Sequence, residues 1–165
     1  MKQLIVVRHA KSSWGDFGQK DFDRTLSERG RKDAPEMGLR LLKDGVKIDA
    51  FLSSPAKRAK KTCLAFTEAY GHDKEEIIFI DKLYHASCEI FYNTTEQLDD
   101  KFNSIAIFSH NPGITEFVNS ICKEMHIENM PTCGVFAMKT NIDHWKVFRE
   151  AKKEFLFFKY PKEGQ

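Results

Sequence analysis

The sequence lacks any long hydrophobic run. Its first apolar stretch, Leu4–Val7, is closed by Arg8 and is far shorter than the core of a signal peptide. No later run approaches the roughly 20 apolar residues that a membrane-spanning helix needs. We therefore expect a cytoplasmic protein with no membrane partner.

A large excess of charge of one sign is also missing. The 165 residues include 26 Lys and Arg against 24 Asp and Glu, so the formal net charge is only +2 at pH 7. Such a small charge argues against nucleic-acid or membrane binding by the whole surface, although a local basic site can still bind an anion. The basic segment 57–61 fits a solvated helix face better than a nucleic-acid patch, because apolar residues occupy the other side of that helix. We expect no nucleic-acid partner.

Cysteine is scarce and shows no paired spacing. Cys63, Cys88, Cys122 and Cys133 are widely separated along the chain. This pattern favours neither a zinc site nor a disulfide framework, so we expect reduced thiols that are mostly buried. Repeats, low-complexity tracts and flexible linkers are absent as well. A chain of this length can bury one substantial core, which predicts a single domain over residues 1–165.

Four short apolar runs predict the strands of a parallel sheet. Each run is continuous rather than alternating, as in strands that are covered by helices on both faces. The runs are Leu4–Val7, Ala50–Leu52, Ile77–Ile80 and Ile105–Phe108.

Segments with helical spacing lie between these runs. Ala34, Met37, Leu41 and Leu42 form one apolar stripe, behind a predicted capping box of Thr25 and Glu28 and ahead of a terminating Gly45. Three further helices are predicted: residues 54–66, opening with Ser54 and Pro55; Ser87–Asp99; and residues 111–125, opening with Asn111 and Pro112.

The remaining apolar segments predict additional strands. These are Gly134–Met138, Trp145–Phe148 and Phe155–Phe158, with a hairpin around Asn141–Asp143 joining the first two. Strands and helices thus alternate four times before the extra strands. This order predicts a three-layer α/β/α sandwich with a mostly parallel central sheet.

Basic and histidine side chains follow three of the predicted parallel strands. Arg8 and His9 end the first strand, Arg58 follows the second, and His110 follows the fourth. Open parallel sheets bind ligands at the carboxyl ends of their strands, beside helix N-termini that favour anions. An arginine can make two charge-assisted bonds to phosphate oxygens, and a histidine can donate to an oxygen or attack phosphorus. The set is typical of a phosphoryl-transfer site.

These segments resemble a known family. Arg8–Lys11 resembles the Arg-His-Gly/Ala signature of the histidine phosphatase (phosphoglycerate-mutase-like) superfamily. Ser12–Trp14, Asp21–Arg24 and Leu26–Gly30 resemble its SixA-type phosphohistidine phosphatase branch. Two more segments, Ser53–Thr62 and Ser109–Gly113, are similar to the family's second arginine and second histidine segments, and they follow in the same order. The resemblance covers residues 1–125.

The resemblance implies a phosphoglycerate-mutase-like fold and a role for each matched residue. His9 would attack phosphorus and become phosphorylated, while Arg8, Arg58 and His110 would hold the phosphoryl oxygens until water hydrolyses the intermediate. Ser12 would also bind the substrate phosphate. No metal or other cofactor is implied, because side chains supply the charge. Asp21, Asp23 and Arg24 are interpreted as ties for the loop after the first strand rather than as substrate contacts.

One departure from the family bears on the substrate. Relatives that act on phosphate esters keep a carboxylate after the third strand, which protonates the departing alkoxide. Residues 81–87 have no glutamate at that point, and His85 is the possible acid there. Phosphohistidine depends less on such an acid, because its leaving nitrogen is protonated more readily. We therefore expect a phosphorylated protein or peptide as the substrate.

Two alternatives remain at this stage. One is a phosphomonoesterase for a small phosphorylated metabolite. The other, from a different class, is a phosphate-binding module with little or no turnover.

Overall fold

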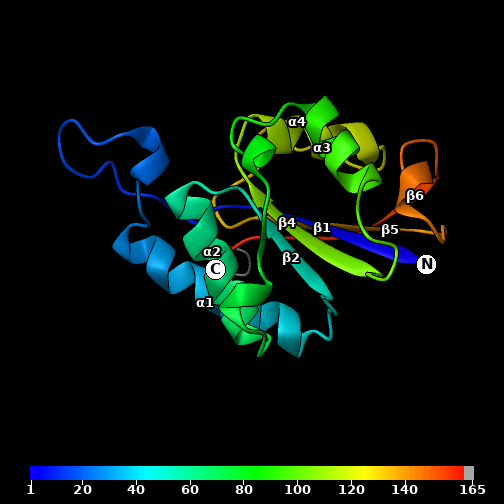
Figure 1. Cartoon of the computed structure of the whole chain (residues 1–165), viewed down its shortest axis with the longest axis horizontal. Helices are drawn as coiled ribbons and strands as arrows, with labels where there is room; N and C mark the ends of the chain where they lie inside the picture. Colours follow the sequence, from blue (N-terminus) through cyan, green and yellow to red (C-terminus); the bar gives the residue numbers. More distant parts are fainter. Residues whose placement is uncertain (162–165) are drawn as a thin grey trace.

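A computed structural model describes residues 1–161, in which six strands form one sheet with helices on both faces (Figure 1). The strand order is β3-β2-β4-β1-β5-β6. The strands are β1 (Lys2–Arg8), β2 (Ala50–Ser53), β3 (Ile78–Phe79), β4 (Ser104–Ser109), β5 (Val135–Thr140) and β6 (Lys153–Lys159). The α-helices are α1 (Glu28–Lys43), α2 (Lys57–Ala69), α3 (Cys88–Glu96) and α4 (Gly113–Ile121). Short 3-10 helices span Asp21–Asp23, Lys74–Glu76, Asp81–Leu83 and Trp145–Val147.

The first four strands are parallel to one another, and the last two run antiparallel to their neighbours. Val6 of β1 is in register with Ile107 of β4 in a parallel pair, and Ile5 is in register with Ala137 of β5 in an antiparallel pair. The prediction of a mostly parallel α/β/α sandwich is confirmed. No helix within residues 1–161 is both long and apolar enough to cross a membrane.

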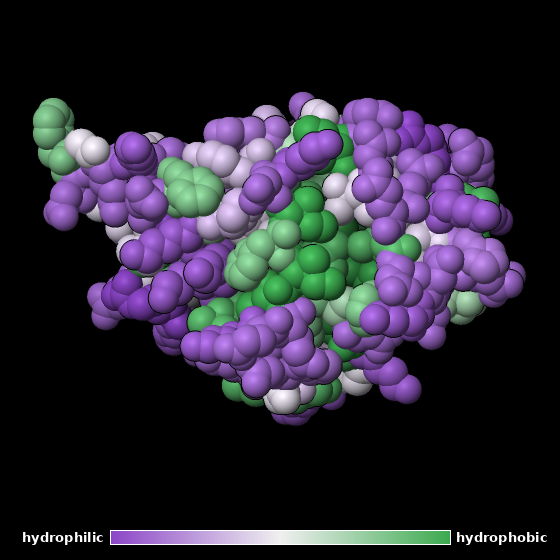
Figure 2. Space-filling model, in the orientation of Figure 1, coloured by the Kyte–Doolittle hydropathy of each residue, from purple (hydrophilic) through white to green (hydrophobic). Residues whose placement is uncertain are grey.

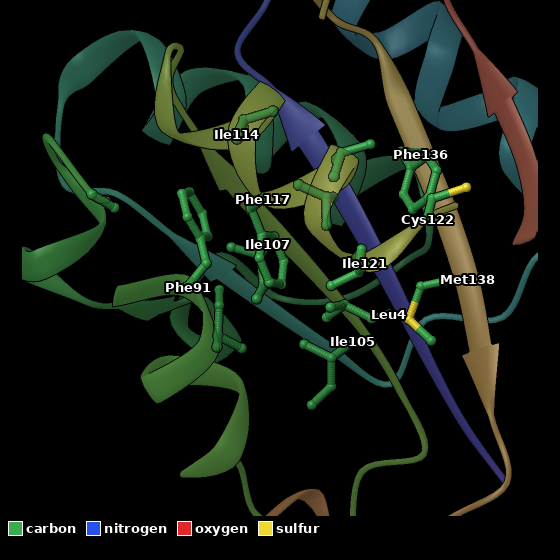
Figure 3. Packing of buried hydrophobic residues seen from close by; sticks show 14 of the residues in the cluster. Leu4, Phe91, Ile105, Ile107, Ile114, Phe117, Ile121, Cys122, Phe136 and Met138 are labelled. Atoms are coloured by element: carbon green, nitrogen blue, oxygen red, sulfur yellow. The ribbon is translucent and has the colours of Figure 1, made fainter. Parts of the chain in front are cut away.

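Both faces of the central strands are buried, which explains their continuous apolar runs. In β1, Ile5 and Val7 belong to the core beneath α1 and α2, together with Met37 and Phe66. Successive side chains of a strand point to opposite faces. Leu4 and Val6 accordingly belong to the core on the other side. Figure 3 shows that second core, where side chains of β1 and β4 meet those of α3 and α4; its residues include Phe91, Ile105, Ile107, Ile114, Phe117 and Ile121.

The third strand differs from the prediction. Only Ile78 and Phe79 of the run Ile77–Ile80 form β3, which pairs with β2 at the edge of the sheet. Both side chains are 42% exposed rather than covered on two faces. Figure 2 shows hydrophobic side chains gathered at the centre of the viewed face. A cleft of about 600 Å³ lies between this edge and α3, lined in part by Ile78, Ile80, Ile90 and Leu98.

The predicted strand at Trp145–Phe148 is wrong, and so is the hairpin at Asn141–Asp143. Trp145 opens a 3-10 helix, and Trp145 and Phe148 are both fully buried. Two apolar residues three positions apart share one face of a 3-10 helix, whereas a strand needs an even spacing. The Trp145 Nε1–H also donates to the Phe102 carbonyl at 2.9 Å. The antiparallel neighbour of β5 is therefore β6, and residues 141–152 connect the two strands.

The helix starts differ from the predictions by a few residues. α1 is capped by Ser27, whose Oγ accepts from the Gly30 N–H, and not by the predicted Thr25. The helix predicted over Ser87–Asp99 is present as α3, where Ser87 is the N-cap; the helix ends at Glu96 and does not reach Asp99. At α2 and α4 the predicted openings lie just before the helix. Their first helical residues are Lys57 and Gly113.

Candidate functional site

A pocket lies where the segments that follow β1, β2 and β4 come together. Its volume is about 300 Å³. The sequence-predicted residues Arg8, His9, Ser12, Arg58 and His110 all line it. Its other lining residues are Lys11, Trp14, Arg24, Asn111 and Thr132.

His9 is held at the end of β1 by its backbone. Its N–H donates to the Ser109 carbonyl of the neighbouring β4, and its carbonyl accepts from the Cys133 N–H. The next N–H, that of Ala10, donates to Thr62 Oγ1 at 2.9 Å, and that hydroxyl donates to the Arg58 carbonyl at 2.8 Å. Thr62 thus ties the His9 segment to the first turn of α2. The His9 side chain is buried, with 6% of the residue exposed.

The His9 ring has only one plausible neutral tautomer. Its Nδ1 lies 2.8 Å from the Ala10 carbonyl, which can only accept, so Nδ1 carries the proton. The lone pair is therefore on Nε2, which lies 3.4 Å from the Arg58 Nε donor. This arrangement directs an unprotonated nitrogen into a basic pocket.

Arg58 is fixed by Asp21, a residue of the loop between β1 and α1. Arg58 Nη1 donates to the Asp21 backbone carbonyl at 2.7 Å, and Nη2 donates to the Asp21 carboxylate at 3.0 Å. The same carboxylate oxygen accepts from the Tyr84 hydroxyl at 2.7 Å. Arg58 lies in the first turn of α2 and is 6% exposed.

Two buried polar atoms in the pocket have no hydrogen-bond partner among the described residues. They are Arg8 Nε and His110 Nδ1. Arg8 uses Nη1 to donate to the Met130 carbonyl, and His110 Nε2 lies 2.7 Å from Ser54 Oγ. Buried polar groups are normally paired, so these two atoms suit an anion that enters the pocket. The His9 and His110 rings lie 5.2 Å apart.

Arg24 was interpreted from the sequence as a loop tie, but the structure also places it in the pocket lining. It donates to Asp21 Oδ1 at 3.0 Å and to the Ser13 carbonyl at 3.2 Å, which holds the loop. Its Nη2 donates to Ser12 Oγ at 2.5 Å. Ser12 and Arg24 therefore form one unit at the pocket wall.

The sequence does not predict two sets of contacts: those of Asp21 with Arg58 and Tyr84, and that of Ser54 with His110. Asp21 had been noticed only as a loop residue, and Ser54 only as part of a helix opening. One available signal is the pair Asp21 and Arg24, an acid and a base placed three residues apart in the segment between the first strand and the first helix. Tyr84 carries no such signal, because its contact with Asp21 joins residues 63 positions apart.

Burial keeps both pocket histidines neutral. Desolvation is the main cause that lowers the pKa of His9 to about 3, and the charges of Arg58, Arg8 and Arg24 add to it against the opposing bond to Ala10. Desolvation likewise lowers the pKa of His110 to about 3, with further lowering by His9 and Arg58. Burial and the charge of Arg58 also lower the pKa of Arg8.

Asp21 behaves in the opposite way. Its partial burial by itself would raise its pKa, but the hydrogen bonds from Tyr84, Arg58 and Arg24 outweigh that effect and hold the pKa well below its usual value. Burial and the bond to Asp21 raise the pKa of Tyr84. The Asp21 carboxylate is therefore ionised across the neutral range.

His85, the possible acid, lies beside the pocket and not in its lining. It is exposed, and its ring centroid is 3.9 Å from that of Tyr84. Its backbone has a φ of 60°. Within residues 1–161 there is no cluster of three or more His, Cys, Asp or Glu side chains that could hold a metal ion.

A comparison with protein-family models assigns residues 4–117 to the histidine phosphatase superfamily, branch 1. Among curated proteins, the chain is 30% identical to an uncharacterized chloroplastic protein from Arabidopsis thaliana over 124 residues, 70% of this chain and 56% of that protein. It is 38% identical to phosphoserine phosphatase 1 from Hydrogenobacter thermophilus over 86 residues, 49% of this chain and 40% of that enzyme. The matches thus span about half the length of these relatives.

Solved structures with the same fold include two SixA proteins. The SixA protein from Agrobacterium tumefaciens, a candidate phosphohistidine phosphatase, has a TM-score of 0.82 and 25% identity, with 97% of this chain and 98% of that chain covered. The protein histidine phosphatase SixA complexed with tungstate has a TM-score of 0.81 and 17% identity, with 96% and 97% covered.

Proposed function

This chain belongs to the histidine phosphatase superfamily, and from that premise we propose that it is a phosphatase which hydrolyses phosphohistidine in a protein or peptide. His9 is the proposed nucleophile. Its Nε2 is unprotonated, faces the pocket and is kept neutral by burial, which are the properties that attack on phosphorus requires.

Arg8, Arg58 and His110 are the proposed phosphoryl-binding residues, with Ser12 and Arg24 beside them. The unpaired Arg8 Nε and His110 Nδ1 can each donate a hydrogen bond to a phosphoryl oxygen. The Ser54 hydroxyl accepts from the Ala56 N–H, which leaves its proton free to bond His110 Nε2 and so keep the imidazole proton at Nδ1. The bond formed at each donor strengthens as charge develops on the transferring group.

The observation that carries the choice of substrate is the absence of a protonated carboxyl group. Among residues 1–161, no Asp or Glu lines the pocket, and the neighbouring Asp21 is held ionised. An alkoxide leaving group needs a strong proton donor, whereas the nitrogen of a phosphoramidate accepts a proton readily. The site is therefore better suited to breaking a phosphorus–nitrogen bond than an ester bond.

The proposed reaction has two steps. In the first, the lone pair of His9 Nε2 bonds to phosphorus while the bond to the substrate imidazole breaks; the imidazole leaves with that electron pair and takes a proton from solvent. In the second, water attacks phosphorus, the bond to His9 breaks, and the water loses a proton to solvent. Inorganic phosphate and the original His9 result.

A second candidate is a phosphomonoesterase for a small molecule. It is favoured by the position of His85, whose ring packs on Tyr84, which in turn lies 5.6 Å from the ring of the pocket residue His110. A histidine in this position is a candidate proton donor to an ester oxygen. A phosphoserine phosphatase is also among the curated relatives.

A paired turnover assay tests these functions. The purified protein is given a phosphohistidine peptide and p-nitrophenyl phosphate, with His9→Ala as the inactive variant and His126→Ala as a control at an exposed histidine outside the pocket. We expect much faster release of phosphate from the peptide, and loss of activity only in His9→Ala. Cleavage of the ester alone would instead support the phosphomonoesterase. His85→Gln should then strongly reduce the hydrolysis of phosphoserine, whose departing alkoxide needs a proton, and leave that of p-nitrophenyl phosphate nearly unchanged. Phosphate binding without any turnover would support a binding module.

A further inference from the structure

Trp14 is a large apolar side chain that the fold leaves in water. It is 81% exposed, whereas the other tryptophan, Trp145, is fully buried. A single exposed apolar side chain is not in itself a sign of function, so the position of Trp14 relative to the pocket is what matters. Trp14 lines the pocket that contains His9, Arg58 and His110.

Trp14 is held in place by Arg24. The Arg24 guanidinium carbon lies 4.0 Å from the centre of the indole, a cation–π contact that covers one face of the ring. Arg24 is itself fixed by its bonds to Ser12, the Ser13 carbonyl and Asp21. Because Trp14 is 81% exposed, the ring face opposite Arg24 is open to solvent.

The backbone around Trp14 is also ordered. The N–H of Ser13 donates to the Thr25 carbonyl at 2.9 Å, and Ser12 bridges to Leu26 in an antiparallel pair. Gly15 follows with a φ of 62°, where the chain turns away from the pocket. The ring is thus presented at the pocket wall by a fixed segment, and little ordering is needed when a ligand binds.

We propose that Trp14 is a specificity-determining residue whose open indole face stacks on the imidazole ring of the substrate phosphohistidine. This inference rests on the proposed function. The pocket polar groups bind the phosphoryl group, which every phosphorylated substrate shares, so they do not distinguish a ring from an aliphatic group. A flat aromatic surface beside these groups can distinguish them, because offset stacking occurs only when the substrate also carries a ring.

Phe17 provides a control within the same loop. It is fully exposed but does not line the pocket. In Figure 1 this loop, the blue segment after β1, projects from the left side of the molecule, and Figure 2 shows hydrophobic atoms at the end of the projection. Phe17→Ala therefore removes an exposed aromatic ring of the same loop without changing the pocket wall.

The test compares two substrates that share a phosphorus–nitrogen bond. Phosphohistidine carries a ring, and phosphoramidate carries only ammonia as its leaving group. We expect Trp14→Ala and Trp14→Leu to lower kcat/KM for phosphohistidine about five- to tenfold more than for phosphoramidate. Trp14→Phe, which keeps a ring, should retain most of the preference, and Phe17→Ala should retain all of it. Circular dichroism checks that each variant is folded.

The outcomes separate the two proposals. Equal losses on both substrates would mean that Trp14 acts only through Arg24, and unchanged rates would mean that it has no role; either result overturns the inference and leaves phosphohistidine hydrolysis standing. If the unmodified protein hydrolyses phosphoramidate but not phosphohistidine, or neither of them, the proposed function fails and the stacking inference fails with it.

Discussion

Arg58 is proposed to bind the phosphoryl group, and its own side chain is positioned by Asp21. Its two terminal nitrogens both donate to Asp21, and its Nε faces His9. An arginine that is already oriented loses less freedom when it binds a phosphoryl group. Asp21 is thus a positioning residue that acts through Arg58.

Asp21→Asn should separate rate from binding. The substitution removes the charge that aligns Arg58, so we expect kcat to fall about tenfold. KM should stay the same or decrease, because the pocket becomes more positive. Steady-state kinetics on a phosphoramidate substrate measure both constants, with Asp23→Asn as the control for loop charge. A rise in KM with unchanged kcat would contradict this role.

The lowered pKa of His9 predicts how the reaction rate depends on pH. A histidine with an ordinary pKa of about 6.5 is roughly 90% protonated at pH 5.5 and would lose about tenfold in kcat/KM relative to neutral pH. Burial lowers the pKa of His9 to about 3, so this proposed nucleophile stays neutral at pH 5.5. We expect a much smaller loss in the rate of phosphoenzyme formation. A tenfold fall in the rate of phosphoenzyme formation, centred near pH 6.5, would contradict a buried, neutral His9 as the nucleophile.

Among the elements, the central strands were the most predictable part of the fold. Their apolar runs result directly from burial on both faces, and Leu4–Val7 and Ile105–Phe108 lie within β1 and β4. The wrong predictions lie in segments whose secondary structure is determined by tertiary contacts. The segment at Trp145 has the composition of a strand, yet the spacing of its buried aromatic residues and its bond to Phe102 favour a 3-10 helix.

The same distinction applies to the site. Arg8, His9, Arg58 and His110 could be grouped in advance, because parallel strand ends share one edge of a sheet. The roles of Asp21, Tyr84 and Trp14 could not be predicted, since they depend on contacts between distant segments. Asp21 accepts from Arg58 and from Tyr84, which lies 63 positions further along the chain, and Trp14 is held at the pocket by its contact with Arg24.

The start of α4 depends on a glycine. A Cβ at Gly113 would lie 1.9 Å from the Ala86 carbonyl oxygen, and this helix turn also carries the bond from the Ile114 N–H to the His110 carbonyl. We expect Gly113→Ala to lower the free energy of unfolding by about 1–3 kcal/mol and to reduce turnover by displacing His110.

Urea denaturation and turnover measure these two effects. Gly71→Ala is the matched control, because Gly71 has a φ of 73° but open space around the added methyl group. It should cost about 1 kcal/mol through backbone strain and leave turnover unchanged. Full activity in Gly113→Ala would show that the helix start is more adaptable than the close approach implies.

At the scale of the whole molecule, the buried histidines link folding to pH. Burial lowers the folded-state pKa of His9 and His110 to about 3, while the unfolded chain takes up protons at about 6.5. The unfolded state therefore binds more protons between these values. Stability is fully present above pH 6.5 and decreases as the pH falls towards 3, by at most about 2 kcal/mol per histidine at pH 5.

Urea unfolding at pH 7.5 and pH 5.0 measures this linkage. We expect His9→Gln and His110→Gln each to reduce the difference between the two pH values, because each removes one buried group that cannot take up a proton. Inorganic phosphate should also stabilise the protein, because it binds the folded state and not the unfolded chain. An unchanged pH difference in both variants would show that other groups control the acid sensitivity.

The four cysteines have a consequence for how the protein responds to oxidants. All four are free, and burial raises the pKa of Cys63 to about 12 and raises that of Cys133, whose N–H supports the His9 carbonyl. Neither thiol ionises near neutral pH, and the pocket lining contains no cysteine. Peroxide and alkylating agents attack thiolates. We therefore expect turnover through the proposed nucleophile His9 to resist the reagents that inactivate cysteine-dependent phosphatases.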